Sequence, residues 1–445
     1  MPLPILGGTK LADTAFSVAN SCRFNDGDSA ELTRTLGTPT DADKWTLSVW
    51  IKRGVLGVSM AIADAASDGN NYTEIHFDTN DKLNWDEKHS NSYVMRLITT
   101  RVFRDPSAWY HIVFTYDSGN ATAGNRMRIY VNGTEETSFG TDSAPSQDLD
   151  SKFNSAVAHA IGSVSPEGGS MYFDGYMAEV VLSDGQAYAA SDFGEFDEDS
   201  PTIWKPKDVS GLTFGDNGFY LDFEASDNLG NDANGGTDWS ESNLAAVDQT
   251  TDTPTNNFCT LNPLSRNRLY TYSEGNTKYT VSSANDSTQG TFGMGGGKWY
   301  WEVKDVAGPE IMLGVQDNNL ITQETDASVN AGSCTAKWFA ISDGTDGTYY
   351  SNCTSSSQSG FGVTTNDIVS VAYNADNGKL WFAINGTWFD SGDPAGDSNP
   401  AMTVTTSSSI VPFFGSNSSS SRTRSANFGN PDYANSSDAA DANGY

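Results

Sequence analysis

Apolar and polar residues alternate with a period of two in several short segments of the first half of the chain. In residues 45–51 the odd-numbered positions are apolar and would face a core, which leaves Trp50 on the opposite face. Residues 109–117 carry apolar side chains on both faces, as expected for a central strand of a sandwich. Residues 127–131 and 172–182 continue the pattern. Alternation over such short lengths predicts β-strands.

Asp-Gly and Asn-Gly pairs recur between these segments, as at Asn132-Gly133 and Asn385-Gly386. Such pairs tolerate the positive φ that tight hairpin turns require. The turns and the short alternating segments together predict an all-β protein.

The second half of the chain repeats a two-strand sequence pattern of the first half. A strand ending in Tyr-Asp (109–117) precedes one ending in Asn-Gly (126–133), and residues 367–374 and 378–386 follow the same order. The simplest interpretation is two related β-sandwiches in tandem.

Composition suggests where the sandwiches begin and end. After a plausible strand at 219–223, residues 224–257 are rich in Asp, Asn, Gly, Ser and Thr, which is typical of a connector. We therefore expect a first sandwich over 1–205, a polar connector with one strand over 206–262, a second sandwich over 263–430, and a mobile tail over 431–445.

The chain is strongly acidic, with 25 basic and 57 acidic side chains and a formal net charge of −32. Nucleic acid is therefore a poor partner, because a phosphate backbone needs a basic face, and anionic membranes are disfavoured for the same reason. No apolar run approaches the roughly 18 residues of a spanning helix, and the first residues do not resemble a signal peptide. We expect a soluble protein without membrane insertion.

The four cysteines do not predict a metal or redox site, because no C-x-x-C pair occurs. Cys334 and Cys353 are either a disulfide pair or two ordinary thiols.

The strand segments resemble two known modules. Residues 45–50, 109–113, 129–133 and 173–180 resemble, in that order, strand signatures of laminin-G-like domains of the concanavalin A-like lectin/glucanase superfamily. Residues 297–303, 311–315 and 378–388 resemble a SPRY domain. The resemblance covers about 18–200 and 265–430 and implies two concanavalin A-like, jelly-roll sandwiches. The pairing is similar to virion proteins of marine bacteriophages.

No catalytic residue is predicted. Glycosidases of this superfamily carry Glu-x-Asp-x-x-Glu on one strand, and the nearest segment, 195–200, ends in Ser200 instead of a carboxylate. The four histidines are also too dispersed for a metal site.

Calcium is a candidate cofactor, because one loop of the connector offers many oxygen ligands with glycines between them. A metal-free Asx-Gly loop is the plainer interpretation. The candidate ligands are Asp227, Asn231, Asp232, Asn234 and Asp238.

Sugar binding would use exposed aromatic rings beside Asp and Asn partners. For each such aromatic residue, ordinary packing is the competing interpretation. The candidate residues are Trp85, Asp86, Tyr349, Tyr350 and Trp388.

These features lead to the hypothesis of a non-enzymatic phage protein, made in the host cytoplasm and displayed on the virion surface as a fibre, appendage or decoration. Its expected partners are host-surface glycans and other virion proteins, and self-association is left open. The main alternative is a purely structural capsid or tail decoration, and the third is a glycan-cleaving enzyme.

Overall fold

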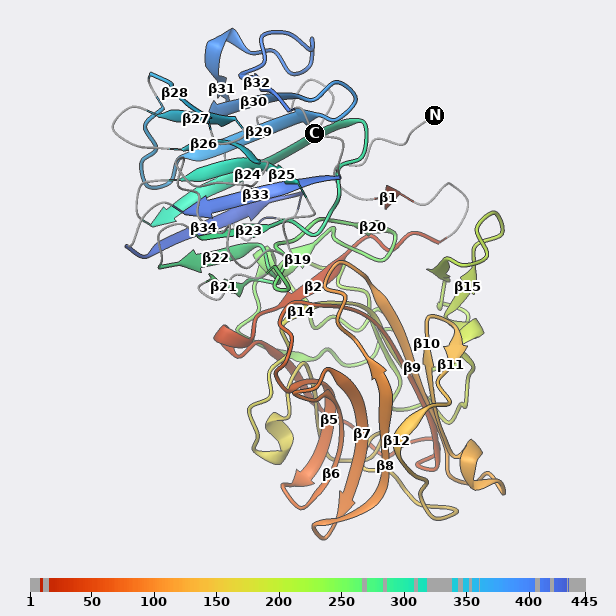
Figure 1. Cartoon of the computed structure of the whole chain (residues 1–445). Helices are drawn as coiled ribbons and strands as arrows, with labels where there is room; N and C mark the ends of the chain where they lie inside the picture. Colours follow the sequence, from red (N-terminus) through yellow and green to blue (C-terminus); the bar gives the residue numbers. More distant parts are fainter. Residues whose placement is uncertain are drawn as a thin grey trace. The chain divides into compact units, whose positions relative to one another are not determined.

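The computed structural model describes residues 9–10, 16–265, 270–282, 286–307, 311–317, 338–342, 347–351, 354–359, 361–404, 409–416, 420–429 and 431. The described chain consists of β-strands with a few short 3-10 turns, and its contacts divide it into two compact units. The first unit spans residues 10–256, and the second comprises residues 257–445 with residues 1–9 (Figure 1). The expected all-β class with two antiparallel sandwiches is confirmed.

The first unit packs two eight-stranded antiparallel sheets face to face. Sheet I has the order β11-β10-β9-β4-β14-β2-β19, and β17 pairs with β14. Sheet II has the order β12-β8-β7-β6-β5-β13-β3-β18. The strands of sheet I are β2 (Ser21–Phe24), β4 (Lys44–Arg53), β9 (Tyr110–Asp117), β10 (Met127–Val131), β11 (Thr134–Glu135), β14 (Gly175–Asp184), β17 (Phe219–Leu221) and β19 (Gln249–Thr250). Those of sheet II are β3 (Glu31–Thr35), β5 (Met60–Asp68), β6 (Asn71–Phe77), β7 (Lys82–His89), β8 (Ser92–Val102), β12 (Phe139–Ser143), β13 (Ala158–Ile161) and β18 (Ser240–Ser242).

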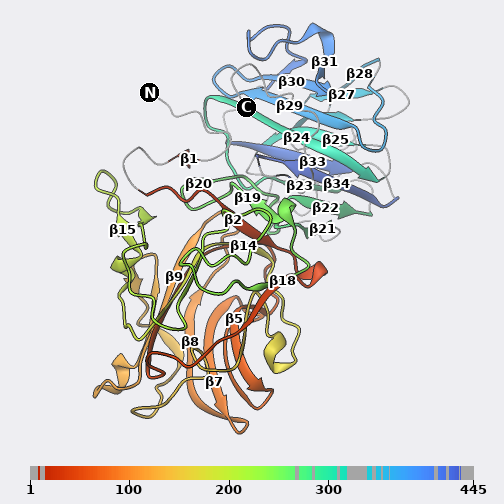
Figure 2. The ribbon, with the colours of Figure 1, turned by 180° about the vertical axis from the view of Figure 1, so that it is seen from behind.

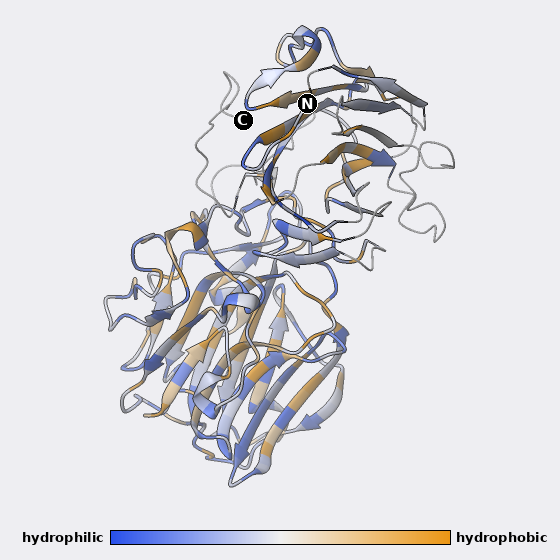
Figure 3. Cartoon of the chain, turned by 90° about the vertical axis from the view of Figure 1, so that its left-hand side faces the viewer, coloured by the Kyte–Doolittle hydropathy of each residue, from blue (hydrophilic) through white to orange (hydrophobic). Residues whose placement is uncertain are grey.

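The core of this unit follows the alternation of the sequence. Trp45, Leu47, Val49 and Ile51 of β4 are buried between the sheets, whereas Trp50 belongs to a separate cluster on the other face of sheet I. Apolar and polar residues alternate along the strands in Figure 3. Strand β9 lies between β4 and β10, as expected for a central strand.

The outer face of sheet I is also covered. The hairpin of β15 (Gly194–Phe196) and β16 (Trp204–Pro206) brings Trp204 beside the buried ring of His111. Sheet I is therefore buried on both faces. We call the outer face of sheet II, where Tyr93 of β8 is 48% exposed, the open face, although its polar side chains on β5, β6 and β7 are largely buried.

The segment expected to be a connector is part of the first unit. Strand β18 pairs with β3 and β19 pairs with β2, and the green segment between β17 and β20 (Asn256–Asn257) runs along this unit in Figures 1 and 2. Arg23 also forms an ion pair with Asp248. The expected boundaries at 205 and 262 are therefore wrong, and the units divide after Asn256. Composition did not reveal this, because the segment places only a few apolar side chains, such as Leu229 and Trp239, in the core and is otherwise held by polar contacts.

The second unit is a smaller sandwich. Sheet III has the order β21-β22-β34-β24-β29-β30-β31, with β32 beside β30, and sheet IV has the order β23-β33-β25-β26-β27-β28. Sheet III comprises β21 (Tyr270–Ser273), β22 (Lys278–Val281), β24 (Lys298–Ala307), β29 (Ile368–Asn374), β30 (Lys379–Ile384), β31 (Thr387–Trp388), β32 (Met402–Thr403) and β34 (Arg422–Asn427). Sheet IV comprises β23 (Asp286–Gln289), β25 (Met312–Asp317), β26 (Trp338–Ser342), β27 (Thr348–Ser351), β28 (Thr354–Ser357) and β33 (Ile410–Ser416).

Some sequence-based expectations fall on other parts of the chain. Cys334, Cys353 and all of the expected tail except Pro431 lie outside the described residues. Within the described ranges, no helix is long and apolar enough to cross a membrane.

Candidate functional site

The open face of sheet II carries a row of charged side chains. Ile75, Trp85 and Leu97 face the core from β6, β7 and β8, so the residues that alternate with them face outward. Asp64 is paired in register with Glu74, Glu74 with Asp86, and Asp86 with Arg96. We call these four residues, which cross β5, β6, β7 and β8, the polar row.

Two carboxylates of the polar row are paired with basic side chains. Arg96 Nε lies 3.0 Å from Asp86 Oδ1, and His76 Nδ1 lies 2.8 Å from Glu74 Oε1. Burial raises the pKa of Asp86 to about 6, although the charge of Arg96 opposes this shift. For His76 burial acts to lower the pKa, but the hydrogen bond and charge of Glu74 outweigh it and leave the pKa raised.

Asp64 and Glu167 form the more protonated end of this face. Asp64 is fully buried, and burial together with the charges of Glu167 and Glu74 raises its pKa to about 9. Glu167 lies on the short turn η3 (Ser165–Glu167), and burial and the charge of Glu74 raise its pKa to about 7. At neutral pH Asp64 therefore holds a proton and Glu167 is about half protonated.

An exposed aromatic ring lies at the other end of the polar row. Tyr93 of β8 is 48% exposed. Lys88 Nζ lies 4.6 Å from the centre of the Tyr93 ring, and the guanidinium carbon of Arg96 lies 4.3 Å from it. Lys88 Nζ also lies 5.2 Å from the ring of Tyr72. We call Tyr72, Asp86, Lys88, Tyr93 and Arg96 the Tyr93 patch.

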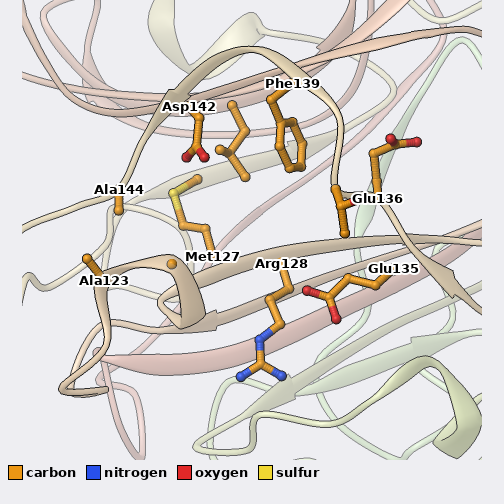
Figure 4. A pocket seen from close by; sticks show the side chains of 11 residues that line it. Ala123, Met127, Arg128, Glu135, Glu136, Phe139, Asp142 and Ala144 are labelled. Carbon is orange, nitrogen blue, oxygen red and sulfur yellow. The ribbon is translucent and has the colours of Figure 1, made fainter.

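A pocket opens at the edge of the same sandwich, beside β10, β11 and β12 (Figure 4). Its volume is about 190 Å³, and Leu97, Met127 and Phe139 supply apolar lining. Figure 4 shows Asp142 beside Met127, with Arg128 and Glu135 along the opposite wall. The pocket is large enough only for a small group, because typical ligand pockets exceed about 300 Å³.

The structure separates the two neighbouring candidates Trp85 and Asp86. Asp86 faces outward within the Tyr93 patch, but Trp85 is fully buried and packs on Trp45 at 5.3 Å between ring centres. The expectation that Trp85 contacts a sugar is therefore wrong. Trp85 is in phase with the apolar Leu83, and this alternation is the signal that could have placed it in the core. Tyr93, by contrast, is not among the residues predicted from the sequence.

The three aromatic candidates of the second unit do not form one site. Tyr349 is buried, stacks on Phe382 and donates a hydrogen bond from its hydroxyl to Asp390 Oδ2 at 3.0 Å. Tyr350 alternates with Tyr349 and so faces the outer side of sheet IV. Trp388 lies in sheet III, with its ring 6.3 Å from that of Tyr300. An exposed Tyr349 is therefore a wrong expectation, and Tyr350 and Trp388 belong to opposite sheets.

Trp388 lies beside a small polar cluster on sheet III. Trp299 and Trp301 face the core, so Tyr300 between them faces outward. The Tyr300 hydroxyl lies within hydrogen-bond distance of Glu302 and 3.1 Å from Ser370 Oγ. This cluster is a second place where an aromatic ring and polar groups lie together.

The candidate calcium loop is held by hydrogen bonds within the protein. Asp232 accepts hydrogen bonds from the backbone of Tyr220 and Asn234, and Arg34 lies 3.4 Å from its Oδ2. Asp238 accepts from Asn228 and from the Asp232 amide. In the described ranges no group of three or more His, Cys, Asp or Glu side chains is arranged to hold a metal ion. The carboxylates of Asp232 and Asp238 are therefore already held by protein donors, and calcium binding by the loop stays a prediction.

The acidic segment 195–200 lies in the hairpin of β15 and β16. Lys205 Nζ lies 3.5 Å from Glu195 and 3.6 Å from Asp197. These carboxylates therefore belong to a short peripheral hairpin, outside the two large sheets of the unit.

Two family models match the chain: the concanavalin A-like lectin/glucanases superfamily over residues 24–190 and the SPRY domain over residues 298–430. The chain therefore contains a concanavalin A-like domain followed by a SPRY domain. No curated protein sequence matches it.

Several solved structures are similar in fold. The PSpry domain of TRIM65 is 16% identical, with a TM-score of 0.29 over 38% of this chain and 91% of that one. A proposed carbohydrate-binding protein from Bacteroides ovatus is 15% identical, with a TM-score of 0.35 over 53% and 60% of the two chains. A SAP-like pentraxin from Limulus polyphemus is 15% identical, with a TM-score of 0.29 over 38% and 77%. At these identities the likeness concerns the fold alone.

Proposed function

We propose that this chain is a non-enzymatic carbohydrate-binding protein and that the Tyr93 patch holds the sugar. The observation that carries the proposal is the exposed ring of Tyr93, which Lys88 and Arg96 flank on the open face of sheet II.

The patch has the two kinds of group that a sugar needs. An exposed ring packs against the apolar C–H face of a pyranose. Lys88 and Arg96, which lie over the Tyr93 ring, can donate to the sugar hydroxyls, and Asp86 can accept from them. Asp86 holds Arg96 from one side through their 3.0 Å ion pair. The donors are thus oriented before the ligand arrives, which lowers the entropy cost of binding.

A glycan array tests the site with Tyr93→Ala. Loss of the ring removes the stacking contact but no core packing, so the affinity for the bound glycan should fall about tenfold while thermal stability is unchanged. Val102→Ala is the matched control, since Val102 lies on the same strand, is 44% exposed and is outside the patch. Unaltered binding by Tyr93→Ala would show that the sugar binds elsewhere.

The proposal includes a location on the surface of a bacteriophage particle, where the sugar would belong to the host cell. The acidic composition, which suits saline surroundings, and the order of the two domains support this location. Other virion proteins would then be partners. A density map of the intact particle, or antibody labelling of intact virions, should find the chain at the exterior, and its absence from purified particles would refute this part.

A purely structural decoration protein is the second candidate function, because the hairpin of β15 and β16 carries two exposed apolar side chains. Phe196 is 45% exposed and Ile203 is 40% exposed. If Phe196→Ser combined with Ile203→Ser releases the protein from particles while Tyr93→Ala leaves adsorption to host cells unchanged, this candidate replaces the first.

The non-enzymatic part of the proposal is tested with polysaccharides. No reducing ends should be released from a broad panel of bacterial and marine glycans. Release that disappears in Glu74→Gln would assign catalysis to the polar row and contradict the proposal.

A further inference from the structure

The segment between β13 and β14 lies over β5, at the Asp64 end of the polar row. We call residues 163–173 the strap. Its turn η3 packs over β5, and the Ala61 amide donates a hydrogen bond to the carbonyl of Met171 at 3.2 Å. Within the strap, Gly168 and Gly169 donate to the carbonyls of Ser165 and Val164 at 3.0 and 3.1 Å. The two ends of the strap are fixed, because Ser163, Val164 and Phe173 are fully buried. The turn η3 between them is the part that can move.

Asp64 lies beneath the strap without a counter-charge. It is fully buried, and neither carboxyl oxygen has a partner with hydrogen-bond geometry, although the amides of Glu167 and Ala65 lie close enough to favour its charge weakly. His76 is paired with Glu74 and Arg96 with Asp86. With no cation paired to it, burial favours the protonated form of Asp64.

The charged and titratable groups near the strap come from six elements. The Glu31 carboxylate of β3 accepts a hydrogen bond from Ser163. Asp64 of β5, Glu167 of η3, Lys88 of β7 and three residues of β6, Tyr72, Glu74 and His76, are linked by electrostatic interactions. Farther along the row, Asp86 of β7 pairs with Arg96 of β8. Three carboxyl groups, those of Asp64, Glu74 and Glu167, act on one another. Ionising all three places like charges together in a poorly solvated space.

We propose that the strap is a pH-sensitive cover of the Asp64 end of the polar row, next to the sugar-binding patch, which lies closed while Asp64 and Glu167 hold protons and loosens when both lose them. This regulation rests on the proposed function only where it concerns sugar binding. The opening itself does not depend on any ligand.

The direction follows from proton linkage. Burial raises the pKa of Asp64 to about 9 in the closed state, and opening lets the carboxyl return toward its ordinary value of about 4. Between these values each rise of one pH unit increases the open population up to about tenfold. Glu167 also acts on Lys88, so opening moves a carboxylate relative to a cation of the Tyr93 patch.

Amide hydrogen exchange on the full chain tests the strap without a ligand. The amides of Ala61, Gly168 and Gly169 should lose at least about tenfold protection, after correction for intrinsic rates, between pH 6 and pH 9. In Asp64→Asn the protection should change much less between the two pH values, because only Glu167 still titrates in this range. Equal protection in the wild type, or a full pH effect in Asp64→Asn, would overturn the proposal.

Two further variants keep the test decisive. If Asp64→Asn does not fold, Glu167→Gln replaces it, because Glu167 is only partly buried, and it should reduce the pH effect. Asp142→Asn, an exposed carboxyl at the edge pocket, should leave the effect unchanged.

If the strap opens while affinity for the array glycan is the same at pH 6 and pH 9, the regulation is refuted and the glycan site stands. If Tyr93→Ala fails to weaken binding, the glycan site is refuted and the opening stands.

Discussion

His111 is a fully buried histidine between two tryptophan rings. Its ring centre lies 4.6 Å from that of Trp50 and 6.0 Å from that of Trp204. Trp204 Nε1 donates to Nδ1 at 2.9 Å, so the proton is on Nε2, which donates to Ser48 Oγ at 2.8 Å. Burial lowers the pKa of His111 to about 3. The ring is a neutral structural link between sheet I and the hairpin that covers it.

Acid should therefore weaken the first unit through His111. The unfolded chain binds a proton near pH 6.5, but the folded ring does not bind one until about pH 3, so this contribution to stability is lost as pH falls between these values. His111→Gln should be less stable than the wild type at pH 7 by about 1–3 kcal/mol, because Trp204 and Ser48 lose their geometry. Its stability should fall less steeply towards pH 4. Urea unfolding at several pH values measures both effects.

Asp64 affects the pH dependence of folding stability with the opposite sign to His111, so a comparison of variants at the two positions separates their effects. A buried carboxyl with a raised pKa favours folding below its ordinary value of about 4, and this contribution is lost as pH rises towards about 9. The stability of Asp64→Asn should therefore change less than that of the wild type between pH 6 and pH 9. Parallel curves for the two proteins would contradict the assignment.

The sequence predicts on which face of a strand a side chain lies when the alternation within that strand is enough. It does not predict which side chains of neighbouring strands lie together. The alternation in 45–51 correctly placed Trp50 away from the core. The same rule would have placed Trp85 inside, but its polar neighbours were given more weight. The polar row depends on the register of β5, β6, β7 and β8, which no local pattern contains.

At the scale of elements, the segment after β19 is fastened by one buried ion pair. Lys52 Nζ lies 2.7 Å from Asp252 Oδ2, and Trp109 Nε1 donates to Asp252 Oδ1 at 3.0 Å. Both charged side chains are almost completely removed from solvent. A strand that would otherwise be a weak two-residue edge is thereby held against β2.

Asp252→Ala should destabilise the first unit by about 3–5 kcal/mol, because it leaves the Lys52 ammonium buried without its carboxylate. Thermal unfolding followed by circular dichroism measures the change. Asp227→Ala, at an exposed position between β17 and β18, should differ from the wild type by less than about 0.5 kcal/mol. A similar, small effect of both substitutions would show that the ion pair does not fasten the segment.

The wrong domain boundary also follows from buried polar contacts such as the Lys52–Asp252 ion pair. Composition reports how many apolar residues a segment offers to a core, and residues 224–257 offer few. It does not report that single polar groups such as Asp252 are buried against partners some 200 positions away. The two-strand sequence pattern can be recognised because it repeats, whereas these long-range polar pairs have no local signature.

At the scale of the whole molecule, the contact division predicts where the chain can be cut. Residues 10–256 and 257–445 should each fold with a β-type circular dichroism spectrum and a cooperative thermal transition. A fragment ending at residue 223 should be markedly less stable, because it lacks β18, β19 and Asp252. Equal stability of fragments ending at 223 and 256 would show that the segment only lies on the surface.

The chain enters and leaves the first unit at neighbouring points. The Val18 amide donates to Thr255 Oγ1 at 3.1 Å, and the same hydroxyl donates to the Val18 carbonyl at 3.2 Å. A module whose two ends meet can be inserted into a surface loop of another protein with little strain on its host. Grafting residues 16–256 into such a loop should therefore give the host protein the open face of sheet II together with the Tyr93 patch.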